Sequence, residues 1–172
     1  VLGVIGLGKL GSQVARVGMA FGMKVIAWSQ NLTDDRAREV GVQRVDKATL
    51  LAEADIISIH VVLSDRTRHL LGRDDLRRMK PSAYVVNTSR GPIIDEDALI
   101  EALTRRYIAG AGLDVYATEP LPADHPLPAL PNTVLTPHIG YATQENFAVY
   151  YTDALADIEA WLKGTPVRLL TG

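Results

Sequence analysis

Three glycines near the start of the chain constrain its fold more than any other feature of the sequence. They lie in Gly6-Leu7-Gly8-Lys9-Leu10-Gly11, directly after the uncharged apolar run 1–5. Such a run is typical of a strand that is buried on both faces. Apolar residues then recur at helical spacing through 14–21. The glycines therefore lie where a buried strand is expected to turn into a helix.

A G-x-G-x-x-G pattern in this context is the signature of a dinucleotide-binding turn. Gly6 permits a tight turn, Gly8 lets the backbone approach a pyrophosphate, and Gly11 lets the helix pack against the strand. The free N–H groups and the positive dipole end of that helix would face the phosphates. The alternative is a glycine-rich turn that holds no ligand. The strand before it, the helix after it and the strand that follows favour dinucleotide binding.

Strand and helix patterns alternate along the rest of the chain. Strands are expected at 24–28, 41–45, 55–61, 83–87, 108–113 and 133–136. Helices are expected at 33–40, 46–54, 95–103 and 143–163, with a pair of short helices within 64–80 and a proline-rich loop at 116–132. This alternation predicts an α/β fold, a doubly wound parallel sheet of the Rossmann type. We expect a dinucleotide-binding domain at 1–142 and a C-terminal helix and return segment at 143–172.

Composition excludes several classes of function. The net charge of −2 over 172 residues shows no excess of positive charge of the size that nucleic-acid binding needs. The arginine-rich stretch 64–80 is interpreted as a solvated pair of short helices, with a basic patch for nucleic acid as the alternative. The chain has no cysteine, so thiol catalysis and disulfides are excluded. No apolar run approaches the ~18 residues of a membrane span, and no His, Asp and Glu residues have the spacing of a metal site. The chain lacks an initiator Met and begins inside the first expected strand, so we expect it to be a piece of a longer protein.

The choice between NAD and NADP is left open by the end of the second expected strand. A carboxylate there would hydrogen-bond the ribose 2′-hydroxyl and select NAD. The position is occupied by Ser29, and no carboxylate follows until Asp34. No arginine adjoins Ser29; the nearest is Arg36, which the pattern favours as a solvated helix residue.

Polar residues follow the expected strands, where the ligands of a parallel sheet bind. They are Ser29, His60, Thr88, Arg90, Asp114 and His138, and we expect them to converge on one crevice. Arg90 can grip a carboxylate with two hydrogen bonds, and His138 can transfer a proton near neutral pH. Glu119 can orient the imidazole. Taken singly, each is as easily a surface residue; His69 and His125 are expected to be solvated, and His60 to line the cofactor pocket.

At this point the chain resembles the cofactor domain of the D-isomer-specific 2-hydroxyacid dehydrogenases, a family that includes phosphoglycerate dehydrogenases and hydroxypyruvate/glyoxylate reductases. The matching stretches, in the family's order, are 6–11, 86–91, 112–120 and 136–140. The resemblance implies that Arg90, Glu119 and His138 are catalytic: Arg90 binds the substrate carboxylate and His138 is the general acid/base. It implies a cofactor site, without a metal, made of Gly6, Gly8, Lys9, Leu10, Gly11, Ser29, His60, Val61, Thr67, Thr88, Ser89, Arg90, Asp114, His138 and Gly140.

The chain departs from the family at Ser29, where NAD-dependent members carry Asp, and in lacking most of the substrate domain. The resemblance implies hydride transfer between NAD or NADP and a small D-2-hydroxy acid or 2-keto acid, a cytoplasmic location and a homodimer, with no nucleic-acid or membrane partner. We expect these 172 residues to bind the cofactor but not to turn over alone. The alternative is a non-enzymatic, NAD(H)-sensing module like that of a related group of transcriptional corepressors.

Overall fold

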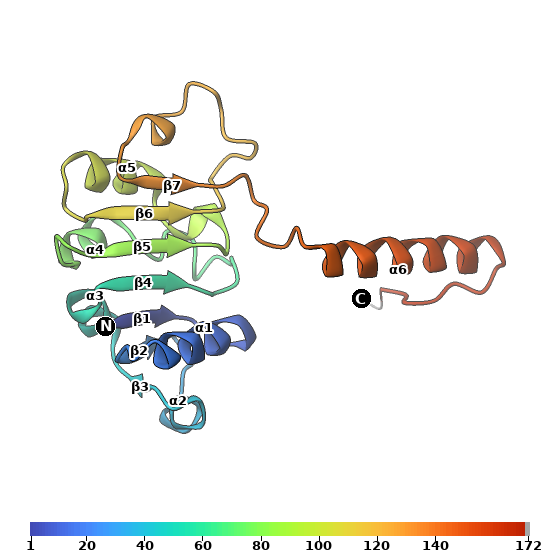
Figure 1. Cartoon of the computed structure of the whole chain (residues 1–172), viewed down its shortest axis with the longest axis horizontal. Coiled ribbons are helices and arrows are strands. Elements are labelled where there is room, and N and C mark those ends of the chain that lie inside the picture. Colours follow the sequence, from blue (N-terminus) through green and yellow to red (C-terminus); the bar gives the residue numbers. More distant parts are fainter. Residues whose placement is uncertain (171–172) are drawn as a thin grey trace. The chain divides into compact units, whose positions relative to one another are not determined.

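The computed structural model describes residues 1–170 of the chain (Figure 1). The chain divides into two compact units, Val1–His138 and Ile139–Gly172. Each unit is described by itself below.

The first unit is built on a sheet that has seven strands within the described residues. The strand order is β3-β2-β1-β4-β5-β6-β7, and every neighbouring pair is parallel (Figure 1). The strands are β1 (Leu2–Ile5), β2 (Val25–Trp28), β3 (Gln43–Arg44), β4 (Ile56–Ile59), β5 (Tyr84–Asn87), β6 (Gly110–Leu113) and β7 (Thr133–Leu135). The order reverses between β1 and β4, which is where a doubly wound sheet opens a crevice at its carboxyl edge. The predicted doubly wound parallel fold is confirmed.

Helices alternate with these strands, and those expected to begin at 33, 46 and 95 start directly after these residues. The α-helices of this unit are α1 (Lys9–Ala20), α2 (Asp34–Val40), α3 (Lys47–Glu53), α4 (Arg73–Arg78) and α5 (Glu96–Thr104). Two short 3₁₀ helices are η1 (Gly91–Ile93) and η2 (Leu127–Ala129). The side chains of Thr33, Asp46 and Asp95 each accept a backbone N–H three residues on, so each satisfies an otherwise unpaired donor of a helix start.

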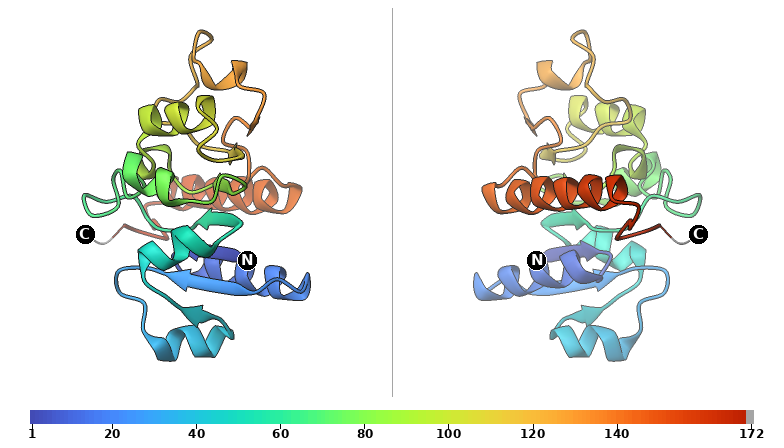
Figure 2. Two further views of the ribbon diagram at one scale, coloured as in Figure 1. Left: turned by 90° about the vertical axis from the view of Figure 1, so that its left-hand side faces the viewer. Right: turned by 90° about the vertical axis from the view of Figure 1, so that its right-hand side faces the viewer.

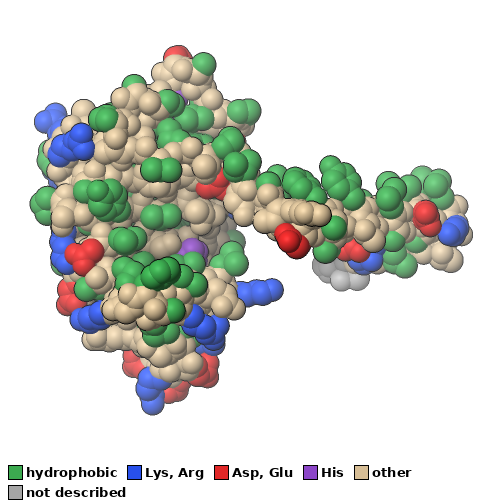
Figure 3. All heavy atoms as spheres, in the orientation of Figure 1, with side chains coloured by type: hydrophobic (Ala, Val, Ile, Leu, Met, Phe, Trp, Pro, Cys, Tyr) green, Lys and Arg blue, Asp and Glu red, His purple; other side chains and the backbone are tan. Residues whose placement is uncertain are grey.

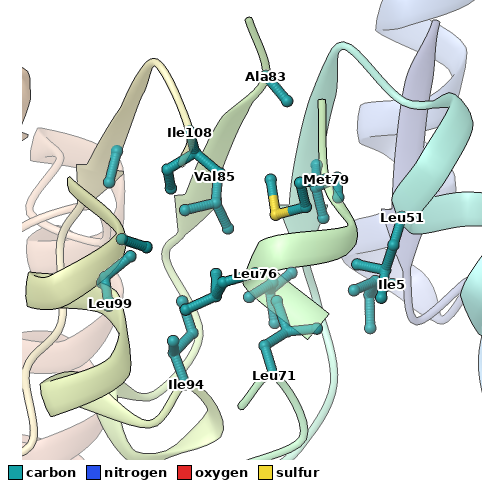
Figure 4. Packing of buried hydrophobic residues seen from close by; sticks show 14 of the residues in the cluster. Ile5, Leu51, Leu71, Leu76, Met79, Ala83, Val85, Ile94, Leu99 and Ile108 are labelled. Carbon is teal, nitrogen blue, oxygen red and sulfur yellow. The ribbon is translucent and has the colours of Figure 1, made fainter. Parts of the chain in front are cut away.

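The core lies in two layers, one on each face of the sheet. One layer joins the inner side chains of the strands to those of α3, α4 and α5, among them Leu51, Leu76 and Leu99 (Figure 4). The other joins β1 and β2 to α1 and α2 through residues such as Ala15 and Val40. In the side views of Figure 2, α4 and α5 lie on one side of the sheet and α1 on the other. The packed sheet therefore holds the strand ends, and the polar residues that follow them, in fixed positions.

The stretch 64–80 differs from its prediction, because it forms one short helix rather than two. Only 73–78 is helical, while 65–69 is a turn. The hydroxyl of Thr67 donates to the carbonyl of Val62 at 2.6 Å and accepts the N–H of Ser64 at 2.8 Å. Such local side-chain bonds offer the backbone an alternative to helix formation. The charged composition of this stretch was therefore not sufficient evidence for a first helix.

The second unit is dominated by one helix, α6 (Gln144–Leu162), which begins where it was expected and is capped by the side chain of Thr143. None of its residues is buried, and Tyr151, Leu155 and Trp161 are more than half exposed. Hydrophobic side chains lie along the surface of this helix in Figure 3. In residues 1–170, no helix is both long enough and apolar enough to cross a membrane. The predicted division of domains after residue 142 stays a prediction.

Candidate active site

The glycine loop forms the turn that its sequence predicts. Gly6 has φ +95°, and a Cβ there would lie 2.7 Å from the carbonyl oxygen of His60. A Cβ on Gly11 would overlap the carbonyl of Gly6, so the helix could not pack this close to the loop. Gly8 is different, because a Cβ there would meet no atom within 4 Å. The open space in front of Gly8, at the start of α1, fits a pyrophosphate that the backbone N–H groups could bind.

A cavity of about 520 Å³ lies beside this loop, at the carboxyl ends of β1 and β2. Its wall is formed by Gly6 and Gly8, by the residues that directly follow β2 and β4, by the turn around Thr67, and by Arg36 from α2. Ser29 is part of this wall, as expected for the residue that meets an adenosine ribose. Arg36 was interpreted as a solvated helix residue, and its place in the cavity wall was not predicted.

A second cavity, of about 310 Å³, lies next along the same edge and shares Val61 and Val62 with the first. It is lined by Leu10, His60, Thr88, Ser89 and Arg90, all of which were predicted as site residues. Desolvation lowers the pKa of His60, so its ring is neutral at neutral pH, and its Nε2 lies 2.8 Å from the hydroxyl of Ser58. His60 therefore contributes an uncharged ring to the wall of this cavity.

Arg90 is positioned by the residues that precede it at the end of β5. Buried Asn87 donates from Nδ2 to the carbonyl of Arg90 at 2.9 Å and accepts the N–H of Ser89 at 3.0 Å. The hydroxyl of Ser89 donates to the carbonyl of Val61 at 2.6 Å, which ties this turn to the end of β4. The guanidinium of Arg90 remains exposed. These bonds hold the turn, and the Arg90 guanidinium, whose Nη1 donates to the carbonyl of Ser89 at 2.6 Å, keeps further N–H groups that can bind a carboxylate.

His138 and Glu119 form an ion pair, with 2.6 Å between Nδ1 and Oε2. The other carboxylate oxygen accepts the backbone N–H of Tyr116 at 3.0 Å, so Glu119 is held at both ends. Burial acts to raise the pKa of Glu119, but the hydrogen bonds from His138 and Tyr116 and the charge of Arg90 outweigh it and lower that pKa. The pair borders a cavity of about 460 Å³ that Tyr116, Leu121 and Pro137 also line. An ionised carboxylate on Nδ1 directs Nε2 of the imidazole toward other partners.

Asp114 is buried directly after β6 and accepts a hydrogen bond from the hydroxyl of Thr136 at 2.5 Å. The phenol of Tyr116 donates toward the carbonyls of Leu113 and Thr136, at 3.2 and 2.9 Å. Burial raises the pKa of Tyr116, with the charges of Asp114 and Glu119 acting in the same direction. These contacts join the ends of β6 and β7, from which Glu119 and His138 follow. Thr136 and Tyr116 were not predicted as site residues, because only the folded chain brings them to Asp114.

A second carboxylate–imidazole pair fastens the proline-rich loop that carries Glu119. Glu96, at the start of α5, accepts the backbone N–H of Ala117 at 3.1 Å, and its other oxygen lies 3.2 Å from Nε2 of His125. The side chain of His125 is only 15% exposed, so the prediction that it is solvated was wrong. The prediction for His69, by contrast, is confirmed, since it is exposed. Glu96 and His125 are 29 residues apart, so no local pattern in the sequence could predict that they pair.

The predicted site residues share one edge of the sheet and line three cavities there, of which the first two adjoin at Val61 and Val62. Ser29 and Thr67 line the first cavity, His60, Thr88 and Arg90 the second, and Glu119 and His138 the third. Lys9 is exposed at the first position of α1. Gly140 belongs to the unit 139–172, and its role stays a prediction. In residues 1–170, no three His, Asp or Glu side chains are grouped as metal ligands.

Comparisons with known proteins agree with this arrangement. Residues 1–140 match the family model of the D-isomer specific 2-hydroxyacid dehydrogenase, NAD binding domain. A glyoxylate reductase of Aeropyrum pernix is 47% identical over 144 residues, which are 84% of this chain and 43% of that protein. The crystal structure of a D-lactate dehydrogenase with NAD⁺ from Lactobacillus jensenii has a TM-score of 0.83 at 34% identity, covering 99% of this chain and 55% of that one.

An acyclic imino acid reductase in complex with NADPH and D-Arg has a TM-score of 0.79 at 34% identity, covering 99% of this chain and 53% of the other. The chain thus spans about half the length of these proteins. The family match covers the glycine loop and all of the strand-end residues described above, from Ser29 to His138. The chain therefore belongs to the D-isomer specific 2-hydroxyacid dehydrogenases, of which it is the NAD-binding domain.

Proposed function

We propose that this chain is the cofactor-binding half of an enzyme that interconverts a small D-2-hydroxy acid and its 2-keto acid. The observation that supports this most strongly is the ion pair between His138 and Glu119, with Arg90 near enough for its charge to lower the pKa of that carboxyl. A proton donor, a group that orients it and a cation for a carboxylate are the parts that reduction of a 2-keto acid needs.

Each side chain has one task in this proposal. The bound nicotinamide supplies or accepts the hydride. Arg90 binds the carboxylate of the substrate and sets the keto carbon at the cofactor. His138 gives a proton to the carbonyl oxygen in reduction and removes it in oxidation. Glu119 positions the imidazole through Nδ1 and is itself ionised at neutral pH, because its hydrogen bonds and the charge of Arg90 lower its pKa.

The dinucleotide itself is bound along the carboxyl edge of the sheet. The glycine loop and the start of α1 hold the pyrophosphate, and the cavity that contains Ser29 takes the adenosine end. The second cavity, with His60, Thr88 and Ser89, takes the nicotinamide end, and Asp114 contributes from the end of β6. Gly8 leaves space for the phosphates. The uncharged ring of His60 repels neither the oxidised nor the reduced nicotinamide. These residues therefore fit a nicotinamide dinucleotide.

The corepressor-type alternative has no observation in its favour. The matching family model and the three proteins named above are dehydrogenases or reductases. Assembly as a homodimer and a location in the cytoplasm stay predictions from the family resemblance. The substrate of the whole protein is proposed only as a class, the small 2-hydroxy and 2-keto acids.

Two measurements test the proposal. Calorimetry with the 172-residue chain is expected to detect binding of reduced and oxidised dinucleotide. Absorbance of the reduced cofactor is then followed with a panel of 2-keto acids, both for this chain and for the longest natural protein that contains it. We expect turnover only in the longer protein, because hydride transfer needs the keto carbon held at ~3–3.5 Å from its partner in a water-poor cleft.

The variants Arg90→Gln and His138→Gln sharpen this test in the longer protein. Because both residues are also expected at the cofactor site, dinucleotide affinity is measured beside kcat/KM, which is expected to fall by about 10²–10⁴-fold for loss of the acid/base and by more than the affinity does. Full activity of His138→Gln would refute the role assigned to the imidazole. Absence of dinucleotide binding to the chain would refute the placement of the cofactor.

A further inference from the structure

Arg36 reaches from α2 across to the first turn of α1, next to the glycine loop. Its Nη2 donates to the hydroxyl of Ser12 at 3.1 Å, and that hydroxyl in turn donates to the carbonyl of Gly8 at 2.7 Å. Ser12 is 2% exposed, so the contact fastens the guanidinium to the packed part of the fold. A fixed guanidinium loses less conformational entropy when it binds an anion than a free one does.

The guanidinium forms part of the wall of the cavity that contains Ser29. Arg66 is a second cation in that wall, and none of its lining residues, all in the described part of the chain, is an acid. The nearest counter-charge on α2 is Glu39, which pairs with Nη1 of Arg36 at 3.0 Å. Both partners are largely exposed, at 44% and 65%, so this pair is screened by water and holds the cation weakly.

The chemistry of this wall differs from that of a wall that binds an unmodified ribose. A ribose with a free 2′-hydroxyl is held best by a carboxylate, and Ser29 stands at the position where that carboxylate would be. A 2′-phosphate needs the opposite: a cation with several N–H donors in a cavity wall that carries no acid. Within residues 1–170, the Arg36 guanidinium uses one N–H group on Glu39 and one on Ser12. Three of its five N–H groups therefore remain for an incoming phosphate.

We infer that Arg36, with Ser29 beside it, forms a binding site for a 2′-phosphate, so that this domain prefers NADP(H) to NAD(H). The inference rests on the proposed placement of the adenosine end in this cavity. It makes Arg36 a specificity-determining residue, and it gives the open cofactor choice at Ser29 a definite answer.

The experiment measures the affinity of the 172-residue chain for NADPH and for NADH by calorimetry. Adenosine 2′,5′-bisphosphate and AMP serve as paired probes that isolate the adenosine end. The wild-type chain is expected to bind the 2′-phosphorylated member of each pair at least 10-fold more tightly. Raising the salt concentration should weaken binding of that member more than binding of the other.

Arg36→Gln is expected to weaken NADPH by about 10- to 100-fold and to change NADH affinity by less than about 3-fold. Arg36→Lys keeps the charge without the planar fork and should give an intermediate loss. Arg38→Gln is the matched control: Arg38 lies on the same helix, pairs with Asp35 and is 75% exposed, so it should leave both affinities unchanged. Ser29→Asp should weaken NADPH selectively, because it places a charge against the 2′-phosphate.

The inference is overturned if the wild-type chain binds NADH as tightly as NADPH, or if Arg36→Gln weakens the two equally. Equal weakening would show that the guanidinium acts on the pyrophosphate or on folding, and a thermal melt of the variant separates those two cases. Failure of every dinucleotide to bind is a different result, because it refutes the proposed cofactor site itself.

Discussion

The structure separates two glycines that the sequence pattern treats alike, Gly8 and Gly11. Gly8 caps the start of α1 with φ −77° and ψ −158°, a conformation open to alanine, and a Cβ there meets nothing within 4 Å. A Cβ on Gly11 would lie closer than 3.0 Å to the carbonyl oxygen of Gly6, and backbone cannot move aside as a flexible side chain can. We therefore expect Gly8→Ala to impair binding and Gly11→Ala to impair folding.

The magnitudes follow from these two environments. For Gly8→Ala, the weaker N-cap and the reduced entropy of the unfolded chain oppose each other, each contributing about 0.5–1 kcal/mol. Its melting temperature should stay within about 4 °C of wild type, given roughly 2–4 °C per kcal/mol at this size. Gly11→Ala overpacks against backbone and should cost about 3 kcal/mol or more, which lowers the melting temperature by about 6 °C or more.

The expected effect of Gly8→Ala on dinucleotide binding, unlike its effect on stability, is large. A methyl group on Gly8 occupies the space where the pyrophosphate would approach, and it removes one or two charge-assisted hydrogen bonds worth about 1.5–3 kcal/mol each. Dinucleotide affinity should fall by at least about 10-fold. Calorimetry with NADH or NADPH measures this loss, and circular dichroism on the same samples measures the melt.

Gly72→Ala provides the matched control, because Gly72 also caps a helix start and has nothing within 4 Å of its missing Cβ. It lies outside the three cavities described above, so both affinity and stability should stay near wild type. The reasoning is refuted if Gly8→Ala binds the dinucleotide as wild type does, or if Gly11→Ala melts at the wild-type temperature.

Three further outcomes are expected. In the longer enzyme, Glu119→Gln removes the ionised partner of His138 and should move the alkaline limb of the reduction profile to lower pH; an unmoved limb would exclude that partnership. Lys80 and the amino group of Val1 together hold the pKa of Asp55 at about 2, below the ordinary 3.8, so in the 172-residue chain this carboxylate stabilises the fold above pH ~4 and its contribution disappears as the pH falls toward 2. Acid unfolding of Asp55→Asn should therefore be less steep between these pH values, and an identical slope would contradict the assignment. Glu96→Gln should cost about 1–2 kcal/mol and speed proteolysis of the proline-rich loop, whereas an unchanged cleavage rate would show that another contact fastens it.

Local patterns in the sequence were sufficient to predict most of the elements and the fold class. Most of the apolar runs became strands, and the helices expected from Thr33, Asp46 and Asp95 begin at these residues, which cap them. These features depend on residues three or four apart, so they can be recognised without the fold. The parallel sheet then followed, because strands that alternate with helices can connect in few other ways.

The first turn of 64–80 could not be predicted, because hydroxyl-to-backbone bonds of Thr67 compete with helix formation there. The pair of Glu96 with His125 could not be predicted either. It joins residues 29 positions apart that meet only after α5 and the loop have packed. A histidine before a proline is as easily solvated as buried, and tertiary structure decides which.

The same distinction holds for the candidate site. The sequence by itself determined which residues follow the strands, and therefore that Ser29, Arg90 and His138 share the carboxyl edge of the sheet. Only the tertiary structure decided how that edge is divided into cavities, and only it brought the guanidinium of Arg36 to the hydroxyl of Ser12. The reason is physical: strand ends are set by local chain direction, whereas the wall of a cavity is made by segments that approach one another through the packing of the core.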